Sequence, residues 1–179
     1  MSLVEVELAR IMIQETNSEQ YIFFREKKGD RSFPIVIGLF EALAIDRRIR
    51  EVDTPRPMTH DLLANVIRNL GGTLERIAIT DLRDNTFFAR LDVRRFGETV
   101  EVDARPSDAV ALAVQFRCPI LVSEDVIARV SAAPTTESLE ELEKALREAA
   151  EEEPETEGAE EDDEEEEDGD DEEEEDRAG

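Results

Sequence analysis

The sequence predicts an α+β domain with a mostly antiparallel sheet, followed by a disordered acidic C-terminal tail. Segments with strand-like alternation come in two blocks, and about four segments with helical spacing pack with them. Charge is also split along the chain: of the formal net charge of −26 on 179 residues, residues 137–179 (26 acidic, 3 basic) carry −23. The remaining −3 belongs to a nearly balanced body whose length suits one domain.

The first block of strands is expected in three segments separated by turn-forming residues. These segments are Leu3–Ile13, Tyr21–Lys28 and Ser32–Ile37. In the first segment Leu8 and Ile11 fall on opposite faces, which breaks the alternation. A β-bulge near Ala9 would restore it.

Two helices are expected next, because the spacing of the apolar residues changes. The first carries Ala42, Ile45 and Ile49 on one face and ends before Asp53. The second is expected to begin after Thr59, a suitable N-cap residue, and to end at Gly71-Gly72.

The second block of strands is expected over three further segments. These are Leu74–Asp81, Thr86–Arg94 and Val100–Ala104, with turns at Arg83–Asn85 and Phe96–Glu98. A helix that begins at Pro106 is apolar nearly all round, so it should be buried. A short strand over Pro119–Val122 and a helix over Asp125–Val130, capped by Ser123, complete the body.

The sequence divides into three regions. Residues 1–133 form the predicted domain, and residues 134–150 form a linker with a possible short helix that begins at Ser138. Residues 151–179 contain no apolar residue larger than Ala apart from Pro154, so we expect a disordered tail. A polyanion of this kind either competes with nucleic acid for arginines or serves only as a solubilising appendage.

Composition excludes several classes of protein. The body lacks the positive excess of a strongly basic nucleic-acid clamp, and its longest purely apolar run, Ala109–Val114, is too short to span a membrane. The N-terminus lacks the pattern of a signal peptide, and Cys118 is the only cysteine, so we expect a reducing cytoplasm. One histidine and one cysteine also exclude a structural zinc site of the usual kind.

The start of the third helix, Arg105-Pro106-Ser107-Asp108, is the first candidate site. Arg105 would be the N-cap although it has no short acceptor side chain. A free helix N-terminus beside a guanidinium can hold a phosphate. The alternative is structural: Arg105 forms a salt bridge with Asp103 or Asp108.

Two further segments carry side chains that could bind a metal ion or transfer a proton. Asp81 and Asp84 flank Arg83 at a tight turn, so they can converge on a divalent cation or can simply form a hairpin turn. His60, in the first turn of the second helix, can act as a general base or a metal ligand, although a lone histidine there is more often an ordinary surface residue.

Basic and aromatic residues suggest a weak nucleic-acid contact. The arginine cluster Arg47, Arg48, Arg50 and Arg56 is interleaved with acids, which favours a self-paired helix face. A base-stacking surface would have to use Phe24, Phe88 or Phe96, and Phe88 shares a strand face with Arg90 and Arg94.

Four motifs, in this order, resemble the bifunctional nuclease family. They are Phe33-Pro34-Ile35-Val36-Ile37-Gly38 with Phe40-Glu41-Ala42, then Arg56-Pro57-Met58-Thr59-His60-Asp61-Leu62, then Ile79-Thr80-Asp81-Leu82-Arg83-Asp84 with Phe87-Phe88-Ala89, and finally Val102-Asp103-Ala104-Arg105-Pro106-Ser107-Asp108-Ala109. The resemblance spans Leu3 to Val130. Leu39 and Met58 depart from the family pattern but replace no candidate polar residue.

The resemblance implies an α+β domain that forms small homo-oligomers, dimers or trimers, with nuclease activity on DNA and RNA. It places eight residues on the family's polar hallmark positions: Glu41, His60, Asp61, Asp81, Arg83, Asp84, Arg105 and Asp108.

From these positions we predict a metal-assisted site. Asp84 and Asp108, with Asp81 or Glu41, would hold Mg²⁺ or Mn²⁺, which would activate a water molecule. Arg83 and Arg105 would stabilise charge on the phosphate, and His60 would transfer the proton. Arg56, Arg90 and Arg94 would contact the nucleic acid, and Asp61 and Asp103 are further candidates.

The competing hypothesis is a non-catalytic, oligomeric binding or regulatory module. In such a module the polar hallmark residues form a structural salt-bridge network. Arg105 would pair with Asp103 or Asp108, and Arg83 with Asp81.

Overall fold

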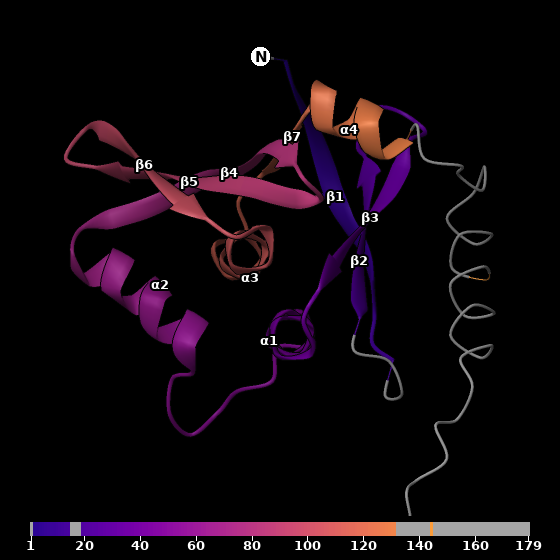
Figure 1. Cartoon of the computed structure of the whole chain (residues 1–179). Coiled ribbons are helices and arrows are strands. Elements are labelled where there is room, and N and C mark those ends of the chain that lie inside the picture. Colours follow the sequence, from indigo (N-terminus) through magenta and orange to yellow (C-terminus); the bar gives the residue numbers. More distant parts are fainter. Residues whose placement is uncertain (1, 15–18, 132–143, 145–179) are drawn as a thin grey trace, which may run out of the picture.

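A computed structural model describes residues 2–14, 19–131 and 144. These residues form seven strands and four helices (Figure 1). Their bounds in chain order are β1 Leu3–Met12, β2 Gln20–Glu26, β3 Ser32–Ile37, α1 Leu39–Ile49, α2 Thr59–Asn69, β4 Gly72–Arg83, β5 Thr86–Arg95, β6 Glu98–Ala104, α3 Pro106–Phe116, β7 Ile120–Ser123 and α4 Glu124–Ser131. The predicted α+β class is confirmed.

All seven strands belong to one sheet, in the order β3-β2-β1-β7-β4-β5-β6. Each predicted block is an antiparallel unit of three strands, and β7 lies between the two units. Ile120 of β7 pairs with Val6 of β1 in antiparallel register and with Ile77 of β4 in parallel register. The contact between β4 and β7 is the only parallel one among the described strands.

The bulge predicted near Ala9 is confirmed, because the β1–β2 register shifts between Leu8 and Arg10. Two further shifts occur in β4 against β5, between Leu74 and Arg76 and between Ile79 and Asp81. The extra residues bend and twist the strands.

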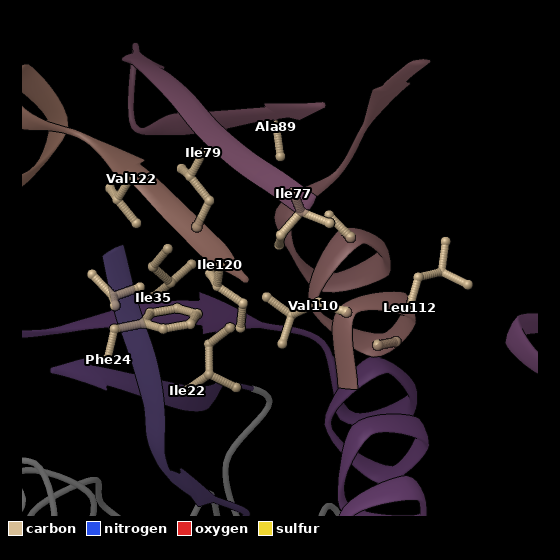
Figure 2. Packing of buried hydrophobic residues seen from close by; sticks show 14 of the residues in the cluster. Ile22, Phe24, Ile35, Ile77, Ile79, Ala89, Val110, Leu112, Ile120 and Val122 are labelled. Atoms are coloured by element: carbon tan, nitrogen blue, oxygen red, sulfur yellow. The ribbon is translucent and has the colours of Figure 1, made fainter. Parts of the chain in front are cut away.

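Helix α3 lies at the centre of the fold, in contact with α1, α2, β4 and β5 (Figure 1). Its buried residues include Ala109 to Ala113, as its nearly continuous apolar sequence predicts. Figure 2 shows Val110 of α3 beside Ile22 of β2 and Ile120 of β7, which are about 100 residues apart in the sequence. The core therefore fixes the start of α3 relative to both halves of the sheet.

Helix α2 packs less completely. Ala64 is its one buried residue, whereas Leu62, Leu63, Val66 and Leu70 are exposed. The predicted N-cap at Thr59 is wrong: Met58 is the N-cap, and its N–H donates to the Asp61 carboxylate at 3.0 Å. That hydrogen bond lets the helix begin one residue earlier, so His60 is its second residue rather than its first.

Among the described residues, no helix is both long and apolar enough to span a bilayer. The linker helix expected over 138–150 and the acidic tail expected over 151–179 lie outside the described residues, apart from Lys144. The cytoplasmic location stays a prediction.

Asp92 anchors the polar face of β5. Its side chain is 2 % exposed and pairs with Arg76 and Arg90, and Arg90 also pairs with Glu101. A buried carboxylate of this kind is strongly destabilising when its cationic partners are removed.

We expect Arg76→Ala to lower the free energy of unfolding by about 3 kcal/mol, because it takes one of its two cationic partners from the buried Asp92 carboxylate. Glu75→Ala is the matched control, since the Glu75–Arg94 pair is exposed and should cost about 1 kcal/mol or less. Urea denaturation measures both. Equal losses for the two variants would contradict a buried anchor.

Candidate active site

Four predicted site residues meet where three helices begin. Glu41 is the third residue of α1, His60 the second of α2, Arg105 the N-cap of α3 and Asp108 the third residue of α3. We call these four residues the helix-start cluster. The packing of α1 and α2 against α3 brings them together from distant parts of the chain.

The Arg105 guanidinium is the centre of the helix-start cluster. Its Nε and Nη2 donate to the two carboxylate oxygens of Asp108 at 2.7 and 3.1 Å, and Nη1 lies 2.9 Å from Glu41 Oε1. Of the two predicted partners, Asp108 is confirmed, whereas Asp103 makes no ion pair with Arg105 in the described structure. Arg105 thus ties the first turns of α1 and α3 together and remains largely exposed.

His60 joins the cluster through Asp108. His60 Nε2 lies 3.0 Å from Asp108 Oδ1, and the two side chains are 18 % and 28 % exposed. Burial works to raise the pKa of Asp108, but hydrogen bonds from Arg105 and His60 outweigh it and hold the pKa below its usual value. Asp108 is therefore ionised near neutral pH, so it accepts from His60 Nε2–H.

The helix ends add positive potential around the cluster. Neither the N-cap of α1, Gly38, nor that of α3, Arg105, provides a side-chain cap. The first N–H groups of a helix have no partner within the helix, and the helix dipole makes this end positive. An anion beside Arg105 would therefore meet both a guanidinium and backbone donors.

Two apolar hollows open on either side of the cluster and share His60, Arg105 and Asp108. One, of about 600 Å³, lies between α2 and the β5–β6 hairpin, and its walls include Val66 and Val102. The other, of about 430 Å³, lies between α1 and α2. The cluster is thus accessible to a ligand that is larger than a single phosphate group.

Asp81 and Arg83 form a separate group of ion pairs. Arg83 Nε donates to Asp81 at 2.6 Å, and Arg129 also contacts Asp81. The hydrogen bond from Arg83 is the main cause that lowers the pKa of Asp81. The predicted Arg83–Asp81 pair is confirmed, but within the described residues no ion pair joins either residue to the helix-start cluster.

Asp84 and Asn85 form the predicted hairpin turn, and both have positive φ (48° and 58°). The Asp84 carboxylate makes no hydrogen bond or ion pair to another described residue. Asn85 lines a third hollow, of about 350 Å³, together with Glu41 and Arg105. The turn therefore borders the cluster without joining it.

Asp61 has a structural role at the start of α2. It accepts from the Met58 N–H and from Arg47 Nη2, both within 3.0 Å. Burial alone would raise the pKa of Asp61, but these hydrogen bonds lower it. Arg56 lies in the loop before α2, where its carbonyl oxygen accepts from the Thr54 hydroxyl.

Arg90 and Arg94 lie on the other face of the sheet. Leu91 and Val93 line the hollow next to α2, and side chains alternate along a strand, so Arg90 and Arg94 point away from it. Both are paired with acids, Arg90 with Asp92 and Glu101, and Arg94 with Glu75. Asp103 is the register partner of Arg90 on β6, and the two residues line a hollow on this face together with Asp81 and Arg83.

The arrangement does not fit a divalent cation between Glu41 and Asp108. The Arg105 guanidinium already contacts both carboxylates. In the part of the chain that the structure describes, no three His, Cys, Asp or Glu side chains are grouped to hold a metal ion. Binding at this point would first require the displacement of Arg105.

Phe40, the second residue of α1, is not among the site residues predicted from the sequence. Its side chain is 83 % exposed and lines the hollow between α1 and α2 with Glu41, His60 and Arg105. Its position in the helix could have indicated its exposure, because Phe40 does not share the helix face of Ala42 and Ile45, the buried residues of α1.

An α+β protein with a histidine, an arginine and two carboxylates at the starts of three helices is a candidate phosphate-binding protein. The model of the bifunctional nuclease domain family matches residues 22–135, well over half of the chain. The chain therefore belongs to the bifunctional nuclease domain family.

Individual relatives fall into two groups. An uncharacterised protein of Mycobacterium tuberculosis is 40 % identical over 144 residues, which cover 80 % of this chain and 86 % of the relative. Bifunctional nuclease 1 of Oryza sativa subsp. indica is 24 % identical over 104 residues (56 % of this chain, 31 % of the relative). Bifunctional nuclease 2 of Oryza sativa subsp. japonica is 26 % identical over 114 residues (62 % and 35 %).

The depressed pKa of Asp108 predicts a pH-dependent contribution to stability. Because the folded pKa lies below 3.8, the contribution is complete above that value and is lost as the pH falls through the folded pKa. We expect Asp108→Asn to destabilise the protein at pH 7, and we expect the difference from the wild type to shrink toward pH 3. Urea denaturation at both pH values measures it.

Asp53→Asn serves as the control for this prediction, because Asp53 is exposed and makes no ion pair within the described residues. Its effect should be small at both pH values. A penalty for Asp108→Asn that is the same at pH 7 and pH 3 would argue against the stabilising ion pairs of Asp108.

Proposed function

We propose that this protein is a nuclease that hydrolyses phosphodiester bonds of DNA and RNA at the helix-start cluster. The observation that carries the proposal is the single group formed by His60, Asp108 and Arg105 beside uncapped helix ends. Membership of the bifunctional nuclease domain family supports the reaction class.

Arg105 would bind the scissile phosphate. A guanidinium carries more N–H donors than the three that contact Glu41 and Asp108, so donors remain for phosphate oxygens. Arg105 is also largely exposed, so substrate can reach it. As the phosphorus becomes five-coordinate, negative charge grows on its oxygens, and a pre-positioned guanidinium stabilises that charge.

His60 would transfer the proton. Ionised Asp108 accepts from Nε2–H, so in a neutral imidazole Nδ1 carries the lone pair. Nδ1 can take a proton from the attacking water as its oxygen bonds to phosphorus. The P–O bond to the leaving oxygen then breaks, that oxygen takes up a proton from solvent water, and His60 returns its proton to solvent. Asp108 stabilises the imidazolium and holds the ring in place.

Glu41 would position Arg105. Its carboxylate folds back toward the start of α1, and a Cβ added at Gly38 would overlap Glu41 Oε2. Gly38 thus leaves room for the Glu41 carboxylate beside the guanidinium. The carboxylates of Glu41 and Asp108 hold the planar Arg105 group from two sides.

Metal assistance by Mg²⁺ or Mn²⁺ stays a prediction, as do the roles of Asp81, Asp84 and Arg83 in it. The mechanism above uses only groups of the helix-start cluster. Cleavage assays with EDTA and with each added metal test the metal prediction directly.

We expect His60→Ala and Arg105→Ala each to lower the cleavage rate of DNA and RNA about 100-fold or more, because each removes a group that acts on the reacting atoms. Arg94→Ala is the matched control: it removes an arginine from the opposite face of the sheet and should leave the rate unchanged. Gel assays with labelled DNA and RNA measure all three. Cleavage that survives in both cluster variants would refute this site.

A non-catalytic module is the second candidate function, and the observed ion pairs Arg105–Asp108 and Arg83–Asp81 favour it. Melting temperature and activity separate the two proposals in the Asp108→Asn variant. If the variant stays folded at neutral pH, with only a moderately lower melting temperature, but loses cleavage, the enzyme is supported. If Asp108→Asn is unfolded at neutral pH and the wild type shows no cleavage, the structural network is supported.

We also propose that the chain forms a homo-oligomer through α2 and β6. Strand β6 lies at the edge of the sheet, none of its residues is buried, and Val100 and Val102 are exposed. Together with the exposed side chains of α2 they line the larger apolar hollow. Natural proteins usually cover such an edge, and large exposed apolar patches mark interfaces.

We expect Val100→Lys to lower the molar mass measured by light scattering to that of a monomer. Val36→Lys is the matched control, because Val36 lies on the other edge strand and is equally exposed (50 % against 49 %). A wild-type chain that is monomeric at micromolar concentration, or equal effects of both substitutions, would contradict this interface.

A further inference from the structure

Phe40 is a large aromatic side chain that the fold leaves in solvent. It is 83 % exposed, although it directly precedes Glu41 of the helix-start cluster. A single exposed apolar residue is ordinary, but this one adjoins a concave site. The hollow of about 430 Å³ that it lines also contains Leu43 and Met58, which are 46 % and 54 % exposed.

The hollow and the helix-start cluster are continuous. His60, Arg105 and Asp108 form the polar end of the hollow, and Phe40, Leu43 and Met58 form its apolar part. A nucleotide has the same division: a charged phosphodiester next to a flat base with apolar faces. A phosphate at Arg105 would therefore place an adjoining base over the hollow.

Phe40 differs from the three rings that the sequence suggests for base stacking, Phe24, Phe88 and Phe96. Arg83 lies 5.1 Å from the ring centre of Phe88, and Arg95 lies 4.6 Å from that of Phe96. Phe24 is fully buried. Within the described residues no guanidinium lies over the Phe40 ring, so its face is open to a base.

A base can reach Phe40 only if it is not paired. In a duplex the bases are stacked inside the helix, and a base must be flipped out at an energetic cost before a side chain can stack on it. In a single strand the faces of the bases are accessible, and stacking on an aromatic side chain is tolerant of sequence.

We infer that the hollow between α1 and α2 is a nucleobase site, in which an unpaired base stacks on Phe40 beside a phosphate held at Arg105. Single-stranded nucleic acid is then the preferred substrate over duplex. The inference rests on the proposed nuclease function, since it uses the same phosphate position.

The test is a binding measurement by fluorescence anisotropy at low salt. Three labelled DNA probes of the same length are compared: a single strand, the matching duplex, and a single strand with abasic sites. The full-length protein carries His60→Asn so that the probes stay intact. In this background Phe40→Ala should weaken binding of the single strand about tenfold and leave the duplex and abasic probes unchanged.

Two further variants complete the design. Phe40→Trp should restore the affinity for the single strand, because it restores an aromatic face. Phe96→Ala is the matched control, since Phe96 is equally exposed (83 %) but lies in the β5–β6 turn, outside this hollow. It should leave all three affinities unchanged.

The inference is overturned if Phe40→Ala binds all three probes as the parent protein does. It is also overturned if Phe40→Ala changes the molar mass of the protein instead, because a second copy would then cover the hollow. A cleavage assay with the wild type distinguishes failure of the base site from failure of the proposed nuclease function. Cleavage that depends on His60 without any effect of Phe40 refutes only the base site, and base-dependent binding without cleavage refutes only the nuclease.

Discussion

The shared guanidinium of Arg105 is the interaction on which the candidate site depends. It bonds to Asp108 within its own helix and to Glu41 of α1, and Asp108 in turn bonds to His60 of α2. Three helix ends that would repel one another through their positive dipoles are held together by two carboxylates. The same contacts leave Arg105 exposed, so the group that organises the site is also the group that can meet a substrate.

The local structure could be predicted from the sequence because its causes are local. The bulge near Ala9 follows from a break in alternation, and the start of α3 follows from Pro106. The predicted start of α2 is one residue late because the N-cap is Met58, a residue type that is unusual there, and the Asp61 carboxylate three residues on accepts from its N–H. Turn residues such as Asp84 and Asn85 were predicted for the same local reason: they tolerate positive φ.

The assembly of the site could be predicted only in part. Family resemblance selected Glu41, His60, Arg105 and Asp108, but their meeting depends on how α1 and α2 pack on α3, which no local pattern encodes. Arg90 and Arg94 are predicted substrate contacts, but the register of the strands gives them acidic partners. Phe40 was missed because the exposure of a ring depends on the tertiary structure.

The position of β7 has a consequence for how the chain acquires its fold. Leu3 pairs with Ser123, so the two halves of the sheet are connected by residues from near the beginning and from late in the described chain. During synthesis each half can form its own hairpins early, but their shared centre stays open until Ile120–Ser123 has left the ribosome. Until β7 forms, the inner edges of β1 and β4 can pair with strands of other chains. The formation of β7 covers both edges and ends this risk of misassociation.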